Sequence, residues 1–294
     1  MATCTTTDVA WPAGAAVIRA RPLLGTIVAI RAEGGASQAA LDAAFAEIEA
    51  VHCAMSFHDA ASEVSCLNRE ASRAPQRVGA RLWRVLRAAL ALARASAGRF
   101  DPAIAGRLVE SGHLPAPQDA PAPQEQACWR DVELLPQQRV RFLRPLWLDL
   151  GGIAKGYAVD RAVAVLRMHG VCAGAVNAGG DLRVFGEASK TIRVRDLCEP
   201  TRTHALLRLR DGAVATSAGY FSANARGSAL VDPGGGARLG GDVSVSVCAP
   251  RAIWADALTK VVLVDPDAAT PLLRRLRAQA ALLDAFCTSR ILPA

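Results

Sequence analysis

The sequence predicts an α+β fold, because helical and strand-like segments both occur without the strict alternation of βαβ units. Ser37 is a good N-cap, and it is followed by apolar residues at helical spacing: Leu41, Phe45, Ile48, Val51 and Met55. The stretch from Val243 to Cys248 reads VSVSVC and alternates as a half-buried strand does. Both periodicities in one chain favour mixed sheets with packed helices.

Further elements are predicted from the same patterns. A second helix carries Leu82, Leu86, Leu90 and Ala93 and ends at Gly98. The remaining predictions, in chain order, are a strand from Thr26 to Arg31, a strand from Leu146 to Leu150, a helix from Lys155 to His169, a short helical segment opened by Asp256, and a helix from Ala268 to Ala280.

The chain is predicted to form one domain over residues 1–294, with a core of about 20–290. Pro115 to Pro123 (PAPQDAPAP) cannot join a helix or sheet interior, and predicts a surface insertion within that domain. Hydrophobic residues make up 51% of the chain, enough for a substantial core. No apolar run approaches the roughly 18 residues of a membrane helix, and Met1 to Pro12 has no signal-peptide pattern. We therefore expect a cytoplasmic protein with no direct membrane span.

Charge and cysteine usage exclude two classes of protein. The net charge is +7, but the basic residues are dispersed and few aromatic residues accompany them, so nucleic acid is not an expected partner. The eight cysteines contain no C-x-x-C pair, which disfavours a zinc site and a disulfide framework. Only three of the 34 basic residues are lysine, namely Lys155, Lys190 and Lys260. Because arginine is the usual basic residue of this chain, each lysine indicates a local requirement for its side chain.

The first glycine-rich acidic motif runs from Asp149 to Asp160 (DLGGIAKGYAVD). A strand end, two glycines and a helix start can direct backbone N–H groups at phosphate oxygens, and Lys155 adds a positive charge. The motif is neither a Walker loop nor G-x-G-x-x-G. The alternative is a tight turn from a strand into a helix.

Two further motifs carry aspartates. Asn177 to Asp181 (NAGGD) permits close backbone approach, and Asp181 can accept from a hydroxyl; the alternative is a hairpin turn with an Asx cap. In Ala255 to Lys260 (ADALTK), Asp256 is either a helix cap or a carboxylate ligand for a hard cation such as Mg²⁺.

Together these motifs resemble the FAD:protein FMN transferase (ApbE) family. The resemblance extends over about residues 20–265 in ordered blocks: Leu24–Thr26, Met55–His58, Ser62–Asn68, Arg99–Pro102, Ala215–Tyr220 and Val231–Pro233. It implies an ApbE-like, T-fold-related α+β domain. It also implies Mg²⁺-dependent transfer of FMN from FAD to a threonine hydroxyl of a target flavoprotein, a membrane-associated redox subunit, with release of AMP.

The resemblance assigns residues to these roles. The implied FAD-binding residues are Leu24, His58, Arg99, Phe100, Asp101, Asp149 and Lys155. The implied metal ligands are Gly152, through its carbonyl, and Asp256. Apart from these implied roles, Asp181 and Lys260 are the candidate catalytic residues because of their own chemistry.

Three positions depart from the family pattern. Lys260 stands where the family has a metal-binding threonine, with Thr259 one residue early. Ala229 stands where the family has a histidine, and Gly235-Gly236 replaces Thr-Gly. These changes leave open a flavin-binding or flavin-delivery protein without transferase turnover, and an FAD pyrophosphatase in which water replaces threonine.

Lys260 lies four residues after Asp256, so both side chains share one helix face. It can pair with Asp256 or reach a pyrophosphate oxygen as a fixed charge with three donors. We therefore predict that Lys260 takes over part of the work of the metal site. The alternative is a surface lysine on a solvated helix face.

Overall fold

A computed structural model describes residues 16–187, 189–197, 199, 201–218, 230–235, 239, 243–284 and 289–293. The chain divides into two compact units. Unit 1 comprises Met1–Ala50, Lys155–Ala218 and Asp242–Ala294, and unit 2 comprises Val51–Ala154 and Gly219–Gly241. The candidate site residues are distributed over both units.

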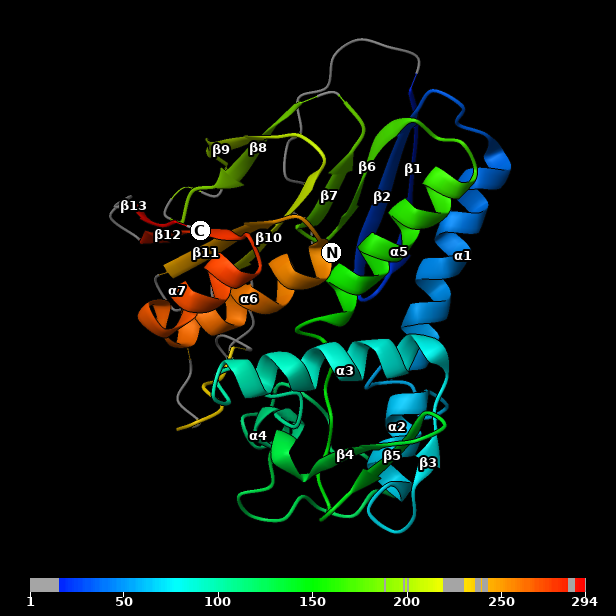
Figure 1. The fold of residues 1–294 in the computed structure, drawn as a ribbon, viewed down its shortest axis with the longest axis vertical. Helices are drawn as coiled ribbons and strands as arrows, with labels where there is room; N and C mark the ends of the chain where they lie inside the picture. Colours follow the sequence, from blue (N-terminus) through cyan, green and yellow to red (C-terminus); the bar gives the residue numbers. More distant parts are fainter. Residues whose placement is uncertain are drawn as a thin grey trace. The chain divides into compact units, whose positions relative to one another are not determined.

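Unit 1 is built on an antiparallel eight-stranded sheet with the order β1-β2-β6-β7-β10-β11-β12-β13 (Figure 1). The strands are β1 Ala16–Leu23, β2 Thr26–Glu33, β6 Ala173–Ala178, β7 Asp181–Phe185, β10 Gly212–Ala218, β11 Val243–Ala249, β12 Gln279–Asp284 and β13 Ser289–Leu292. A separate pair consists of β8 Lys190–Arg195 and β9 Thr203–Leu209.

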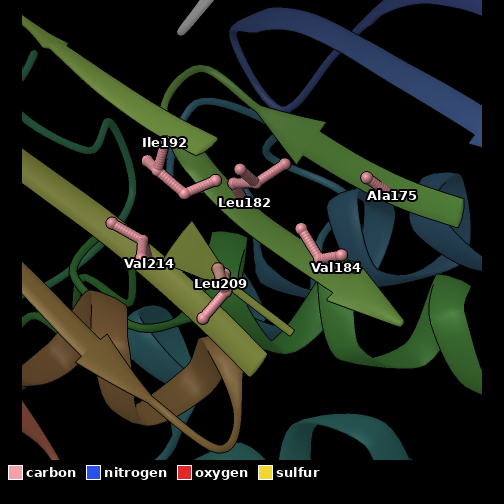
Figure 2. Packing of buried hydrophobic residues seen from close by; sticks show 6 residues of the cluster. All are labelled: Ala175, Leu182, Val184, Ile192, Leu209 and Val214. Atoms are coloured by element: carbon pink, nitrogen blue, oxygen red, sulfur yellow. The ribbon is translucent and has the colours of Figure 1, made fainter. Parts of the chain in front are cut away.

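Alternating burial explains why these segments are strands. In β2 the side chains of Val28, Ile30 and Ala32 are fully buried, while the residues between them are partly exposed. Figure 2 shows one apolar cluster to which five strands contribute. Its members are Ala175, Leu182, Val184, Ile192, Leu209 and Val214. This cluster joins the β8–β9 pair to the large sheet.

The helices of unit 1 are α5 Ala154–Met168, α6 Ala252–Val264, α7 Pro266–Arg275 and most of α1 Gln38–Met55. The helix predicted after Ser37 is confirmed, and the Ser37 hydroxyl accepts the Ala40 N–H at 3.1 Å. Helix α6 packs on β10, β11 and α7.

Unit 2 contains α2 Glu63–Glu70, α3 Ala80–Ala95, α4 Ala105–Glu110 and the short 3₁₀ helix Trp129–Asp131. Its small sheet has the order β3-β5-β4, formed by β3 Gln76–Arg77, β5 Arg139–Phe142 and β4 Val132–Leu135. Helix α3 confirms the second predicted helix, and Gly98 at φ +85° donates its N–H to Ala93 O beyond the helix end. The segment from Pro115 to Pro123 contains neither helix nor strand.

Two predicted elements outside the three glycine-rich acidic motifs are wrong. Leu146 to Leu150 is buried but joins no sheet, because the Asn68 side chain satisfies Leu148 instead: Leu148 N donates to Asn68 Oδ1 at 2.8 Å, and Asn68 Nδ2 donates to Leu148 O at 3.1 Å. The helix predicted from Ala268 to Ala280 is wrong at its C-terminal end. Helix α7 ends at Arg275, Arg277 has φ +52°, and Gln279 opens β12.

Helices combined with antiparallel sheets confirm the α+β prediction. The single domain over residues 1–294 stays a prediction.

Candidate functional site

The Asn177–Asp181 motif forms the hairpin between β6 and β7. Ala178 pairs with Asp181, and Gly179 and Gly180 between them have φ values of +63° and +104°. Positive φ at both central residues is the requirement of a tight hairpin turn, and glycine meets it without strain. Asn177 Oδ1 accepts the Gly180 N–H at 3.0 Å. The local structure is thus the Asx-capped hairpin, and it places Asp181 at the first position of β7.

A second hairpin turn lies against this one. Leu24 and Gly25 connect β1 to β2 with φ values of +56° and +69°. A bulky residue at positive φ is uncommon and strained. A Cβ on Gly179 would lie 2.6 Å from Thr26 Oγ1, so this turn also requires glycine for close approach. Leu24, a predicted FAD contact, therefore belongs to the same end of the sheet as Asp181.

The first motif folds as the turn that leads into α5. Gly156 packs so closely on α6 that a Cβ there would lie 2.2 Å from Ala252 O and 2.8 Å from Asp256 Cβ. The Gly156 N–H donates to Asp256 Oδ2 at 3.0 Å. Gly156 therefore serves the contact between two helices, and this contact brings the first and third motifs together.

Asp256 lies inside α6 and is not the residue that opens it. The helix begins at Ala252 with Arg251 as its N-cap, and the side chain of Asp256 is 0% exposed. The predicted helix start at Asp256 is therefore wrong, as is the alternative of an exposed cap. Helix α6 begins earlier because Asp160 supplies its cap from α5.

Asp160 is a positioning residue to which the sequence interpretation gave no role. Its Oδ1 accepts Ala252 N–H at 3.0 Å and its Oδ2 accepts Ile253 N–H at 3.1 Å. Arg183 and Arg251 form ion pairs with the same carboxylate. The sequence carries only an indirect signal: no Ser, Thr, Asp or Asn directly precedes Ala252, so the helix has no local side-chain cap there.

Four charged side chains of unit 1 converge: Lys155 from α5, Asp181 from β7, and Asp256 and Lys260 from α6. Lys155 Nζ lies 2.6 Å from Asp181 Oδ2 and 3.9 Å from Asp256 Oδ1. Lys260 Nζ donates to Asp256 Oδ1 at 2.5 Å and to Asp256 O at 3.0 Å. We call these four residues the charge cluster.

Burial in the cluster is asymmetric. The side chains of Asp181 and Asp256 are 5% and 0% exposed, whereas those of Lys155 and Lys260 are 31% and 21% exposed. Burial, reinforced by the charge of Asp256, raises the pKa of Asp181 above its usual value. Burial acts the same way on Asp256, but Lys155 and Lys260 outweigh it and lower its pKa. The arrangement therefore holds Asp256 ionised and makes Asp181 the better proton acceptor.

Hydroxyl groups complete the surroundings of Asp256. Thr259 is fully buried and its Oγ1 donates to Asp256 O at 2.7 Å. Ser217 Oγ lies 2.7 Å from Thr259 Oγ1, and since the single threonine proton is used, Ser217 is the donor in that bond. Asp256 O thus accepts from both Thr259 and Lys260.

In unit 2, the Arg99–Asp101 block forms a local turn. Arg99 donates to Ser96 O at 3.2 Å, and Phe100 is buried with its N–H on Ser96 Oγ at 3.1 Å. Asp101 Oδ1 accepts Ala103 N–H at 2.7 Å and Oδ2 accepts Trp129 N–H at 3.3 Å. Burial raises the pKa of Asp101. These hydrogen bonds all lie within unit 2.

Asp149, Gly152 and His58 are the remaining predicted residues of unit 2. Asp149 Oδ1 accepts Gly151 N–H at 3.2 Å, and Asp149 N donates to Pro102 O at 2.9 Å, which places it beside the Arg99–Pro102 block. Gly152 follows in the same turn and is partly exposed. His58 is exposed, with its ring 6.1 Å from that of Phe57 in an edge-on arrangement.

Some predicted positions lie outside the described residues. These are Ala229, Gly236 and the Gly219–Tyr220 end of one block. Asp232 lies within the described residues, and its carbonyl oxygen accepts a hydrogen bond from Arg107 Nη1 at 3.2 Å.

Comparison with known proteins decides the family. The ApbE family model matches residues 24–283, which is most of the chain. The chain belongs to the ApbE family. Its FAD:protein FMN transferase relative from Treponema pallidum (strain Nichols) is 27% identical over 281 residues, covering 84% of this chain and 78% of that protein. Another from Rhodobacter capsulatus is 32% identical over 191 residues, covering 59% of this chain and 36% of that protein.

Solved structures agree with this ApbE assignment. The ApbE protein from Thermotoga maritima superposes with a TM-score of 0.82 at 25% identity, covering 94% of this chain and 96% of that chain. The flavin transferase ApbE from Vibrio cholerae has a TM-score of 0.78 at 21% identity, with the same coverage, and supports the fold. The family resemblance and the ApbE-like α+β fold are thereby confirmed. Both curated relatives are named as transferases, which supports the prediction of a transferase enzyme.

Two features are absent from the described residues. No described helix is long and apolar enough to cross a membrane. No group of three or more His, Cys, Asp or Glu side chains that could hold a metal ion occurs in the part of the chain that the structure describes.

Proposed function

We propose that this ApbE-family chain transfers FMN from FAD to a threonine hydroxyl of a target flavoprotein and releases AMP. The observation that carries the proposal is the charge cluster. It places two lysine ammonium groups, out of only three lysines in the chain, on two buried carboxylates from separate motifs. The named activity of the curated relatives supports the choice of FAD as substrate.

The reaction proposed is a phosphoryl-type transfer. The threonine oxygen attacks the FMN phosphorus and forms a new P–O bond, while the bond from that phosphorus to the bridging oxygen breaks. AMP leaves with the electron pair of the broken bond. Catalysis of such a transfer rests on positioning and on stabilising the charge that develops on the phosphate oxygens.

We assign the proton and the charge to different members of the cluster. Asp181 accepts the threonine proton, because burial raises its pKa and a base works best near the operating pH. Lys260 stabilises the leaving phosphate, since its ammonium has three donors and only two contacts within the described residues. Lys155 holds Asp181 in place and adds a second positive charge.

The FAD contacts are proposed on the positions of the family motifs. They comprise Leu24 and Lys155 in unit 1, and His58, Arg99, Phe100, Asp101 and Asp149 in unit 2. The position of Leu24 in the β1–β2 hairpin turn, at the same end of the sheet as Asp181, supports a binding role. His58 is exposed and offers a ring for stacking.

Mg²⁺ is expected from the family resemblance, with Gly152 and Asp256 as ligands. The residues around Asp256 do not fit this ion in the described arrangement, because Lys260 occupies Oδ1 and the main-chain oxygen while Gly156 occupies Oδ2. Mg²⁺ prefers several oxygen ligands in an octahedral arrangement. We therefore propose Mg²⁺ only as a counterion of the FAD pyrophosphate.

The target protein is proposed to be a threonine-bearing, membrane-associated redox subunit, and the reaction is proposed to occur in the cytoplasm. The family resemblance supports such a target, and the absence of a signal-peptide pattern from Met1 to Pro12 supports the cytoplasm. Dispersed basic residues with a net charge of +7 support attraction of an anionic cofactor and give no reason to expect nucleic acid.

Mass spectrometry of a threonine-motif flavoprotein incubated with this chain, FAD and Mg²⁺ tests the proposal. The expected result is a target heavier by FMN minus water, together with stoichiometric AMP. An Asp181→Asn variant is the control and should bind FAD with much less transfer.

A flavin-binding or flavin-delivery protein is the second candidate, favoured by Ala229 and Lys260 at positions where the family pattern differs. Bound FAD that stays intact, with no AMP and an unmodified target, would support this candidate and contradict transfer. AMP with free FMN would instead indicate FAD pyrophosphatase activity.

A further inference from the structure

The cation position beside Asp256 is occupied by a side chain of the protein itself. Lys260 Nζ contacts Asp256 Oδ1 at 2.5 Å and Asp256 O at 3.0 Å. A carboxylate oxygen together with a main-chain carbonyl oxygen is the kind of oxygen pair that binds a hard cation. We propose that the Lys260 ammonium replaces a divalent cation at Asp256, so that this chain binds FAD without a metal ion there. This inference rests on FAD being the ligand, as in the proposed function.

The charges of the cluster support this replacement. Two carboxylates and two ammonium groups sum to zero in the wild type. Lys155 does not substitute for Lys260, because its close partner is Asp181 at 2.6 Å while Asp256 Oδ1 is 3.9 Å away. Threonine at position 260 would leave the cluster with a net charge of −1 in a buried setting. Such a site recruits a cation, since an unpaired buried charge is costly.

All three oxygen atoms of Asp256 already accept hydrogen bonds within the protein. Oδ2 accepts the Gly156 N–H at 3.0 Å, and the main-chain oxygen already accepts from Thr259 as well as Lys260. Across the described residues, no cluster of three metal-binding side chains provides another site. A metal at Asp256 would first have to displace Lys260.

The lysine also keeps a donor for a ligand. Its ammonium has three N–H groups, of which two are used within the described residues, and its side chain is 21% exposed. The remaining N–H can donate to a pyrophosphate oxygen of FAD. Lys260 thus combines neutralisation of Asp256 with direct contact to an anionic ligand, the two tasks of a bridging divalent cation.

The test compares the wild type with Lys260→Thr and Lys260→Arg. FAD affinity is measured by flavin fluorescence in EDTA and over an Mg²⁺ series at fixed ionic strength. For the wild type and for Lys260→Arg, the dissociation constant for FAD should differ by less than about twofold between EDTA and Mg²⁺. In EDTA, Lys260→Thr should bind FAD about tenfold more weakly than the wild type, and Mg²⁺ should restore its affinity. Arg161→Thr, which removes a positive charge paired with Glu47 elsewhere in unit 1, controls for net charge and should behave as wild type.

A second readout needs no FAD. Mn²⁺ binding, followed by the electron paramagnetic resonance signal of the free ion, should show one more bound ion per chain for Lys260→Thr than for wild type. Equal Mn²⁺ stoichiometry, or FAD binding by the wild type that EDTA abolishes, would overturn the inference alone. Failure of every variant to bind FAD would overturn the proposed function, and the Mn²⁺ count would still decide the inference.

Discussion

The two units hold their candidate residues in different ways. In unit 1, Lys155, Asp181 and Asp256 come from a helix, a strand and another helix, yet their side chains contact one another. In unit 2, Asp101 accepts hydrogen bonds from the backbone N–H groups of Ala103 and Trp129, and Asp149 accepts one from that of Gly151. Charged side chains from distant elements meet in the unit 1 cluster, whereas these two carboxylates of unit 2 accept from backbone N–H groups.

This difference separates two kinds of family motif. Capping a turn requires only local geometry, and a carboxylate there contributes about 1 kcal/mol. Burying two carboxylates together is unfavourable unless cations compensate them. The charge cluster is therefore expected to be sensitive to single substitutions, and the unit 2 turns are expected to tolerate them.

The largest expected effect on stability is that of Asp256→Asn. The change leaves the ammonium of Lys260 beside a neutral amide in a buried setting, and should lower the free energy of unfolding by about 3 kcal/mol. Asp101→Asn, the matched change in unit 2, should cost about 1 kcal/mol. Chemical denaturation of both variants gives the comparison. Equal losses would show that the cluster is not the more strongly coupled region.

A smaller effect on stability is expected at two glycines of the Asp149–Asp160 motif. Gly156→Ala places a methyl group 2.2 Å from Ala252 O, so helices α5 and α6 must move apart at a cost of about 1–3 kcal/mol. Gly151→Ala meets only the Asp149 side chain, at 3.1 Å, and should cost less than about 1 kcal/mol. Thermal unfolding measures both. A Gly151 variant as unstable as the Gly156 variant would contradict the assigned helix contact.

The smallest effect is a pH dependence of opposite sign for the two buried carboxylates. Lysines lower the pKa of Asp256, so its stabilisation is present above the unfolded value of about 3.9 and is lost as pH falls below it. Burial raises the pKa of Asp181, so stabilisation from its protonated form is lost as pH rises above about 3.9.

Removing each group therefore acts in a different pH range. Asp256→Asn should flatten the loss of stability below about pH 4, and Asp181→Asn should raise stability at pH 6 relative to pH 4. Unfolding free energies over a pH series check both signs. The same sign for both variants would contradict the assigned electrostatics.

Periodicity predicted the elements that have strong local patterns. The five apolar residues from Leu41 to Met55 are all buried in α1, and VSVSVC lies in β11. Leu146 to Leu150 is apolar and therefore resembles a strand, but the backbone of Leu148 bonds to the Asn68 side chain, 80 residues away in sequence. Only tertiary structure shows such a partner.

The sequence likewise predicted only those contacts of the candidate site that depend on local spacing. The spacing of Asp256 and Lys260 indicated their pairing, because residues four apart share a helix face. The contact of Lys155 with Asp181 joins α5 to β7, and no sequence spacing reveals it. The sequence did not reveal that Asp160 caps α6, because Asp160 lies 92 and 93 residues before Ala252 and Ile253, whose N–H groups its carboxylate accepts.

A crystal structure of the chain with FAD and Mg²⁺ tests the central claim most directly. The claim is that the charge cluster binds the pyrophosphate and that Lys260 is the cation at Asp256. The predicted result is a pyrophosphate oxygen within hydrogen-bonding distance of Lys260 Nζ, with that ammonium still on Asp256. An octahedral ion about 2.0–2.1 Å from an Asp256 oxygen, with Lys260 displaced into solvent, would contradict the claim.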